Sequence, residues 1–249
     1  MASQTDVLPS AAGNFPSAWE ISKTVEGWMT REQGLALFRA AQAALPGTRL
    51  VEIGSHHGRS TVLLAKAAPA GVSVLAVDPY EDVRWGGGTS AFDIFRGNLN
   101  RAGVAERVEV FRGTSEQALP QYDKRPIGML YIDGAHDLKS VLIDIDGWEP
   151  YAVEGAVVAI HDAFSSTGVT RAILRRHLFS RSFRYLGSVR SLALFRREDL
   201  SAASATMSAF WIACRLMYFA RNAAVKVARR QGWKWPQRAL LHVDAADPY

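Results

Sequence analysis

The sequence has little cysteine and no recognisable export signal. Cys214 is the only cysteine in 249 residues, so no disulfide can form within the chain and nothing argues for an oxidising compartment. The first twenty residues lack the basic cluster and the following apolar run of a secretory signal peptide. We therefore expect a cytoplasmic protein. Its length suits one α/β domain with extensions, and it contains no internal repeat and no low-complexity linker.

Acidic residues are missing from one long stretch, residues 201–243. The whole chain has a formal net charge of +5, and this stretch carries seven of its basic residues: Arg215, Arg221, Lys226, Arg229, Arg230, Lys234 and Arg238. The remainder holds 22 basic and 24 acidic groups. The basic character therefore belongs to the tail, which argues against a nucleic-acid partner for the protein as a whole.

An uninterrupted membrane-spanning run is also missing. Residues 203–220 are apolar on almost every face, but the run is marginal in length and contains Arg215. We expect residues 200–249 to form a basic, apolar helical extension that packs in a homodimer or over the domain. Contact with a membrane surface through Trp211 and Tyr218 is the alternative. Residues 1–24 are expected to form a mobile N-terminal arm.

Short apolar runs alternate with helical periodicity between these extensions, over residues 25–199. Five runs are β-branched and almost continuously apolar, as strands covered on both faces must be, at 49–54, 72–78, 107–111, 127–133 and 155–162. Helical stretches lie around them, at 31–45, 90–103, 137–148 and 170–181. Two further runs, 183–189 and 191–197, have no helix between them. The pattern predicts a Rossmann-like, doubly wound α/β domain whose seven-stranded sheet is mostly parallel and has an antiparallel terminal hairpin.

The parallel runs of this sheet end in polar or glycine-rich residues. The five ends lie at 52–58, 78–80, 113–116, 133–136 and 161–162. Ligands of such sheets bind beyond the carboxyl ends of the strands, near the point where strand order reverses. These residues are therefore the candidate site.

The first strand end, "VEIGSHHGRST", differs from a dinucleotide fingerprint. Gly54 would let backbone approach a ligand, and Gly58 would open a helix whose N-terminus favours anions. Asp78, on the second strand, suits the vicinal hydroxyls of a ribose. The spacing, however, is E-x-G-x-x-x-G and not G-x-G-x-x-G. Because Glu52 would repel a pyrophosphate and attract a cation, we favour a sulfonium or amino-bearing nucleoside over NAD, and an NAD-binding oxidoreductase is a weaker alternative.

With "AVDPY", "GTSEQAL", "YIDGAHD" and "AIHD", this motif resembles the class I S-adenosylmethionine-dependent methyltransferases. More narrowly, it is similar to the metal-dependent branch that methylates macrolide sugars and bacterial polysaccharides. The resemblance covers residues 25–197. It implies contacts with S-adenosylmethionine from a series of strand-end residues, namely Glu52, Gly54, Ser55, Gly58, Asp78, Gly113, Ser115, Glu116 and Asp133.

The resemblance also implies a divalent cation, Mg²⁺ or alternatively Mn²⁺, held by Asp133, His161 and Asp162, with His136 as general base. Elementary chemistry agrees, since a bound cation lowers the pKa of a sugar hydroxyl and a nearby imidazole can take its proton. Because Mg²⁺ prefers oxygen ligands, the imidazole of His161 would be an unusual ligand for it. His161 is therefore a metal ligand, a residue that supports the ligands, or a substrate contact. Asp133 as a simple helix cap is the plainer alternative.

The predicted function is O-methylation of a vicinal-diol sugar or polysaccharide. The expected partner is a small-molecule or oligosaccharide acceptor. A catechol-type methyltransferase of phenolic compounds is the nearest alternative, although the resemblance there implies lysine in place of His136. A nucleic-acid methyltransferase needs its N/D-P-P-Y motif after the fourth strand, whereas "DPY" at 78–80 ends the second. A non-catalytic membrane-bound scaffold is a further alternative. The glycine-rich segment 81–90 is predicted to be a lid or a flexible surface loop.

Overall fold

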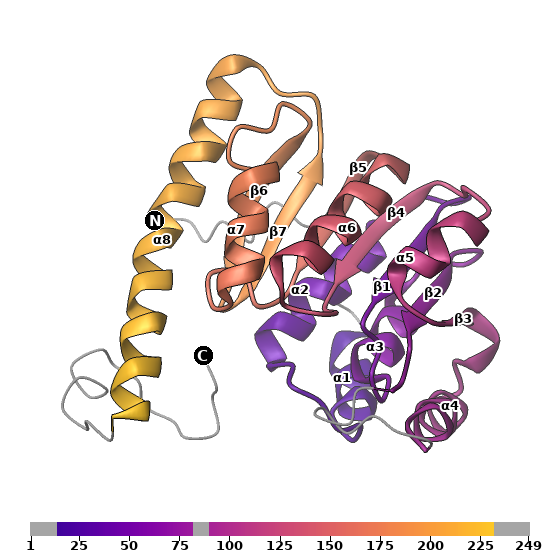
Figure 1. Ribbon diagram of the computed structural model, residues 1–249. Coiled ribbons are helices and arrows are strands. Elements are labelled where there is room, and N and C mark those ends of the chain that lie inside the picture. Colours follow the sequence, from indigo (N-terminus) through magenta and orange to yellow (C-terminus); the bar gives the residue numbers. More distant parts are fainter. Residues whose placement is uncertain (1–13, 82–89, 232–249) are drawn as a thin grey trace.

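The computed structural model describes residues 14–81 and 90–231, so most of the predicted lid segment and both ends of the chain lie outside the described residues. Seven strands form one sheet (Figure 1): β1 (Arg49–Ile53), β2 (Ser73–Asp78), β3 (Val108–Arg112), β4 (Ile127–Ile132), β5 (Ala152–Ile160), β6 (Phe183–Val189) and β7 (Leu192–Arg197). The described α-helices are α1 (Phe15–Ser22), α2 (Arg31–Gln42), α3 (Arg59–Ala67), α4 (Ala91–Ala102), α5 (Ser115–Ala118), α6 (Leu138–Trp148), α7 (Thr167–Arg176) and α8 (Ala202–Arg230).

The strands follow the spatial order β3-β2-β1-β4-β5-β7-β6. Neighbours from β3 to β5 run parallel, and β7 pairs antiparallel with both β5 and β6. The predicted mostly parallel sheet with an antiparallel terminal hairpin is therefore confirmed, with β7 inserted between β5 and β6. Strand order reverses between β1 and β4, which places the ligand crevice at their carboxyl ends.

Helices cover both faces of the sheet (Figure 1). Side chains alternate along a strand, so Leu50 of β1 joins the core beneath α1 to α4, while Val51 and Ile53 join the core beneath α5 to α7. The β1 burial pattern is continuous for this reason. Strands read as apolar runs because both faces are covered.

Part of the predicted N-terminal arm is a helix in the structure. Helix α1 lies within the predicted arm, yet Phe15 and Trp19, four residues apart on one face, are buried. Trp19 packs so closely on α2 that a Cβ at Gly34 would lie 2.7 Å from its ring. The assignment of residues 14–24 to a mobile arm is therefore corrected, because this apolar face packs against the domain.

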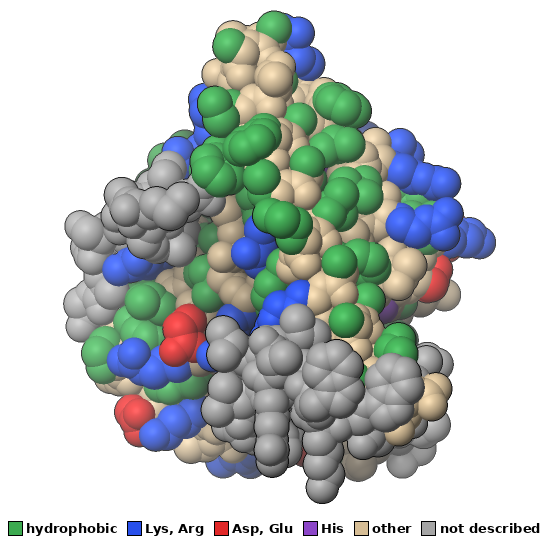
Figure 2. Space-filling model, turned by 90° about the vertical axis from the view of Figure 1, so that its left-hand side faces the viewer, with side chains coloured by type: hydrophobic (Ala, Val, Ile, Leu, Met, Phe, Trp, Pro, Cys, Tyr) green, Lys and Arg blue, Asp and Glu red, His purple; other side chains and the backbone are tan. Residues whose placement is uncertain are grey.

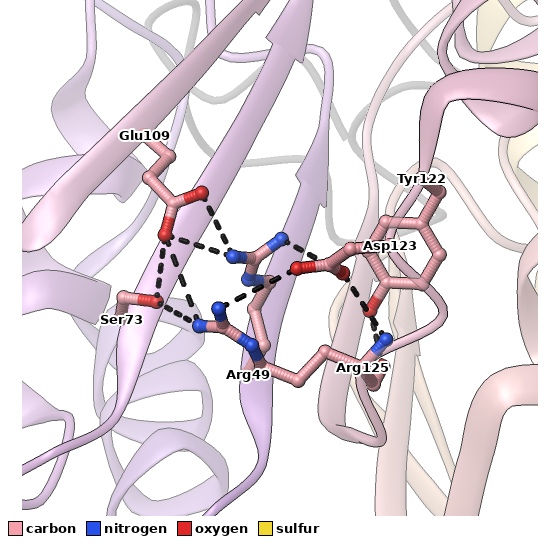
Figure 3. Close-up of polar contacts among 6 residues, drawn as sticks. All are labelled: Arg49, Ser73, Glu109, Tyr122, Asp123 and Arg125. Carbon is pink, nitrogen blue, oxygen red and sulfur yellow. Dashed lines mark hydrogen bonds and ion pairs between the residues drawn. The ribbon is translucent and has the colours of Figure 1, made fainter.

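The edge of the sheet where the strands begin is held by a buried arginine (Figure 3). Arg49 is only 3% exposed, and its Nη2 lies 2.8 Å from both carboxylate oxygens of Glu109. Its Nη1 lies 3.4 Å from Asp123. Since Arg49 begins β1 and Glu109 belongs to β3, the network joins strands at the end opposite the crevice and leaves the carboxyl ends to the site.

Helix α8 runs along the β6 side of the sheet (Figure 1). The Tyr185 N–H of β6 donates to Ser208 Oγ at 3.1 Å, and Ile212 is fully buried. The opposite side of α8 exposes Met207, Phe210 and Met217, and Figure 2 shows apolar and basic side chains gathered on this side of the molecule. Among the described residues, no helix is both long and apolar enough to cross a membrane.

Candidate active site

The ends of β1 and β4 meet at Gly54. This residue has φ +88°, and a Cβ added there would lie 2.2 Å from the carbonyl oxygen of Asp133. The Asp133 N–H donates to Ile53 O at 2.8 Å, and the Gly54 N–H donates to Val77 O at 2.9 Å. Gly54, predicted to let backbone approach a ligand, here lets two strand ends approach each other and so brings Asp133 to the first strand end.

Asp78 shapes the turn that follows β1. Its Oδ2 accepts the N–H groups of Ser55 and His56, both at 2.9 Å, and its Oδ1 accepts the Tyr80 N–H at 2.6 Å. Gly58, with φ +90°, is the N-cap of α3, which confirms that this glycine opens the helix. A carboxylate has about four acceptor positions, so Asp78 retains capacity for the predicted ribose.

Glu52 is fully buried beneath this turn. The Thr61 hydroxyl of α3 donates to its Oε2. Burial raises the pKa of Glu52 to about 7, against the opposing effect of the Ser60 and Thr61 hydroxyls. Glu52 is therefore a carboxyl group whose charge changes near neutral pH.

The end of β3 extends this edge. The Gly113 N–H donates to Asp78 O at 3.1 Å, which places the two strand ends together. The Ser115 hydroxyl donates to Asp144 Oδ1 of α6, and burial raises the pKa of Asp144 to about 6. Glu116 is exposed. The residues predicted to contact the cofactor thus follow the ends of β1 to β4, although Ser115 already has a partner in Asp144.

Asp133 stands at the end of β4 and is oriented from two sides. The Tyr131 hydroxyl donates to its Oδ2 at 2.7 Å, and His161 Nδ1 lies 3.1 Å from its Oδ1. Burial raises the pKa of Tyr131 well above its ordinary value, so its hydroxyl stays a donor. The N-cap of α6 is Asp137, whose Oδ1 accepts two N–H groups at 3.1 Å. Asp133 is therefore not the helix cap, and residues 133–136 form a loop and not a helical turn.

His161 lies behind Asp133 and is 6% exposed. Its Nε2 lies 3.2 Å from the Gln33 amide nitrogen, whose direction is set because Gln33 Oε1 accepts the Thr30 N–H. Burial lowers the pKa of His161, but Asp133 and Asp162 outweigh burial and raise it to about 10. In either charge state of the ring, the proton on Nδ1 faces Asp133.

Three predicted residues offer ligand atoms within 4.8 Å of one another: Asp133, His136 and Asp162. His136 Nε2 lies 3.0 Å from Asp162 Oδ2, and the His136 side chain is 39% exposed whereas that of Asp162 is 4% exposed. The prediction placed His161 in the metal set and His136 outside it. The structure places His136 within this set and engages both ring nitrogens of His161 with protein groups.

The loop after β5 has an unusual backbone. Asp162 and Phe164 have φ +53° and +58°, in the left-handed region that non-glycine residues rarely adopt. Contacts from elsewhere hold this loop: the Asn222 amide of α8 donates to Phe164 O at 3.2 Å, and Lys226 Nζ donates to Ser165 O at 2.9 Å. Helix α8 therefore helps to hold the loop that contains Asp162.

A cleft of about 630 Å³ opens beside these residues, a size typical of small-molecule sites. It is lined by His136 and Asp162, by residues 165–168, and by Phe219, Ala223, Lys226 and Val227 of α8. Sequence reasoning missed the contribution of α8, because nothing in an almost uniformly apolar helix indicates which face meets a loop about 60 residues away.

Comparison with known proteins places this geometry in a family. Residues 51–163 match the family model described as a methyltransferase domain. This stretch of the chain is therefore similar to a methyltransferase domain. The match agrees with the predicted resemblance to class I methyltransferases, and the narrower sugar-methylating branch stays a prediction.

The relatives carry related names. The chain is 32% identical over 143 residues to a catechol O-methyltransferase of Mycobacterium tuberculosis, covering 57% of this chain and 59% of that protein, so it spans about three fifths of that relative's length. The fold is shared with the O-methyltransferase TomG of Streptomyces achromogenes, solved with S-adenosylmethionine, at a TM-score of 0.53 and 19% identity over 78% of this chain and 93% of that one. The fold is also shared with an O-methyltransferase of Bacillus cereus, solved with S-adenosylhomocysteine. The TM-score is 0.51, and the sequences are 20% identical, with 77% of this chain and 92% of that chain covered.

Proposed function

We propose that the protein is an S-adenosylmethionine-dependent O-methyltransferase. The observation that carries the proposal is the convergence of Asp133, His136 and Asp162 beside the crevice between β1 and β4, where His136 and Asp162 also line the cleft. The methyltransferase domain and the named O-methyltransferases among its relatives support it.

The crevice has polar groups suited to this cofactor. The hydroxyls of Ser55 and Tyr80 and Oε1 of Glu52 are buried close to one another, and none of these atoms makes a hydrogen bond of good geometry within the described residues. Buried polar atoms without partners are costly, and a polar ligand would satisfy them. Glu52, which ionises near pH 7, suits the cationic amino and sulfonium groups of S-adenosylmethionine.

The group formed by Asp133, His136 and Asp162 suits metal-assisted removal of a proton from the acceptor hydroxyl. Two carboxylates and an imidazole match the donor set of a divalent cation, and we propose that Asp133 and Asp162 hold it. A bound cation lowers the pKa of a hydroxyl and orients it. His161 and Tyr131, through their contacts with Asp133, position that carboxylate.

His136 is the proposed general base. It borders the cleft, and Asp162 at 3.0 Å stabilises the imidazolium that forms when His136 takes the proton. In the transfer, the acceptor oxygen forms a bond to the methyl carbon, the carbon–sulfur bond breaks, and the sulfur keeps the electron pair. The hydroxyl proton passes to His136, and water receives it afterwards.

We propose a vicinal diol as the acceptor, of a sugar or polysaccharide. A phenolic diol is the second candidate, because the mycobacterial relative is named a catechol O-methyltransferase. Turnover of methyl glycosides against catechols, each with S-adenosylmethionine, separates the two acceptor classes.

Calorimetric titration of S-adenosylhomocysteine, with and without Mg²⁺ or Mn²⁺, tests the core of the proposal. We expect cofactor binding by the wild type and a metal signal that Asp133→Asn removes while cofactor affinity changes little. Asp93→Asn, an exposed carboxylate of α4 away from the site, is the matched control and should keep both signals. No cofactor binding would contradict the methyltransferase activity. Cofactor binding without a metal signal would contradict metal assistance alone.

A further inference from the structure

The loop between β5 and α7 contacts three other parts of the fold. The Ala163 N–H donates to Ser191 O, in the turn between β6 and β7, at 2.8 Å. The Ser166 hydroxyl donates to His136 O at 3.2 Å, so the loop also contacts the backbone of the proposed base. The third part is α8. Because Asp162 belongs to this loop, the conformation of the loop affects two groups of the proposed site.

The loop has a backbone that other parts of the protein must hold. Asp162 and Phe164 are both in the left-handed region, with φ +53° and +58°. Residues other than glycine keep this conformation only where surrounding contacts impose it. Within the loop, the Ser165 and Ser166 N–H groups donate to Asp162 O at 3.2 and 2.9 Å. The carbonyl groups of Phe164 and Ser165 have their partners outside the loop, on α8.

Asn222 is the α8 residue that contacts the second left-handed position. It is only 4% exposed, and its Nδ2 donates to Phe164 O at 3.2 Å. Its Oδ1 accepts from Arg221 Nη1 at 3.2 Å, so the amide nitrogen is the end that faces the loop. Asparagine is a weak helix former that is seldom buried, so its place within α8 is explained by the bond that it makes to the loop.

A second bond from α8 acts on the following residue. Lys226, about one helical turn after Asn222, donates from Nζ to Ser165 O at 2.9 Å. The Phe164 side chain is fully buried, and the Arg215 guanidinium lies 5.8 Å from the centre of its ring. Helix α8 therefore contacts two consecutive carbonyl groups and one side chain of the loop. Among these three α8 residues, Asn222 is the buried one.

We propose that Asn222 is a positioning residue for the methyl transfer. Its amide holds the Phe164 carbonyl and thereby keeps the left-handed loop that presents Asp162 to the cation and to His136. Asn222 acts through the backbone and contacts neither the cation nor the acceptor. This inference rests on the proposed function, including the cation held by Asp133 and Asp162.

Calorimetric titration of Mn²⁺ into protein saturated with S-adenosylhomocysteine measures the effect. Asn222→Leu keeps the size and branching of the side chain but removes the donor. The Kd for Mn²⁺ rises as the fraction of protein with the binding-competent loop falls. We expect it to rise roughly tenfold, as the loss of one hydrogen bond to a buried carbonyl provides, while the Kd for S-adenosylhomocysteine changes less than about twofold. Asn222→Gln, which keeps an amide, should restore part of the affinity for Mn²⁺.

Asn98→Leu is the matched control. Asn98 of α4 is also buried, its Nδ2 donates to the carbonyl oxygen of His57 at 2.7 Å, and its Oδ1 accepts from Arg101 of the same helix. The loop that it holds follows β1 and not β5. The same substitution should therefore lower the melting temperature, as Asn222→Leu does, and yet keep the wild-type Kd for Mn²⁺. Should Asn222→Leu fail to fold, Asn222→Ala removes the same donor and favours the helix.

The outcomes separate this proposal from the proposed function. An unchanged Kd for Mn²⁺ in the folded Asn222 variants, or an equal rise in Asn98→Leu, would overturn the positioning role alone. A wild type that binds S-adenosylhomocysteine but no Mn²⁺ would overturn the positioning role together with metal assistance. Failure of the wild type to bind S-adenosylhomocysteine counts against the methyltransferase function itself.

Discussion

Substitution of Gly54 by alanine should destabilise the protein far more than its size suggests. Alanine in the left-handed region costs about 1–2 kcal/mol. In addition, its Cβ would lie 2.2 Å from the Asp133 carbonyl oxygen and 2.7 Å from the Gly134 nitrogen, which are backbone atoms that cannot rotate away. The ends of β1 and β4 must then separate, which weakens the Asp133 N–H bond to Ile53, worth about 1 kcal/mol. We expect a total loss of about 3–5 kcal/mol, a large share of a typical domain stability of about 5–15 kcal/mol.

Gly71→Ala is the matched control. Gly71 also has a positive φ, +77°, but a Cβ there would meet nothing within 4 Å. Urea unfolding followed by tryptophan fluorescence gives the free energy of unfolding of both variants and the wild type. Gly71→Ala should lose only the cost of the left-handed backbone, about 1–2 kcal/mol. Losses that differ by less than about 1 kcal/mol would refute the close approach of the two strand ends as the reason for glycine.

Three further predictions concern the base, the buried acid and the outer face of α8. His136→Ala should abolish turnover while leaving S-adenosylhomocysteine affinity nearly unchanged in calorimetry; loss of the metal signal would identify His136 as a ligand. Because the pKa of folded Glu52 is raised from 4.5 to about 7, its contribution to stability is fully present below pH 4.5 and is lost as pH rises through 7. Urea unfolding of the wild type should therefore give a free energy of unfolding lower by up to about 3 kcal/mol at pH 8 than at pH 5, and Glu52→Gln should remove this difference. The same difference in Glu52→Gln would contradict the burial argument. We also propose that the exposed face of α8 joins two copies of the chain in a homodimer. Met217→Glu should then halve the mass measured by light scattering. A monomeric wild type would contradict the homodimer and leave contact with an anionic membrane surface as the role of this face.

Sequence patterns predicted the sheet well because both of its faces are covered. Parallel strands covered on both faces are mostly apolar, and the seven predicted strand runs correspond to the observed strands within a few residues at each end. The strand ends stood out for the same reason, since polar residues are conspicuous after an apolar run. Helix α1 was missed because eight residues with only Phe15 and Trp19 as anchors carry a weak periodic signal.

The arrangement within the site was less predictable. His136 meets Asp162, whose backbone is left-handed, a conformation that a sequence indicates reliably only for glycine. The sequence predicted that Gly54 allows a close approach of its backbone to a ligand. In the structure, the group that lies close to Gly54 is the backbone of Asp133. The Gln33 contact that orients His161 spans 128 residues, and no local pattern reports such a distance along the chain.

The dependence of the loop after β5 on α8 has a consequence for how this protein can be divided. The family match ends at residue 163, inside the loop, while the groups that fix that loop follow some 60 residues later. A chain shortened after Leu200 would keep every residue of the matched domain and still lose the support of Asp162. A boundary drawn at the end of the family match would therefore separate the loop after β5 from two of the groups that hold it.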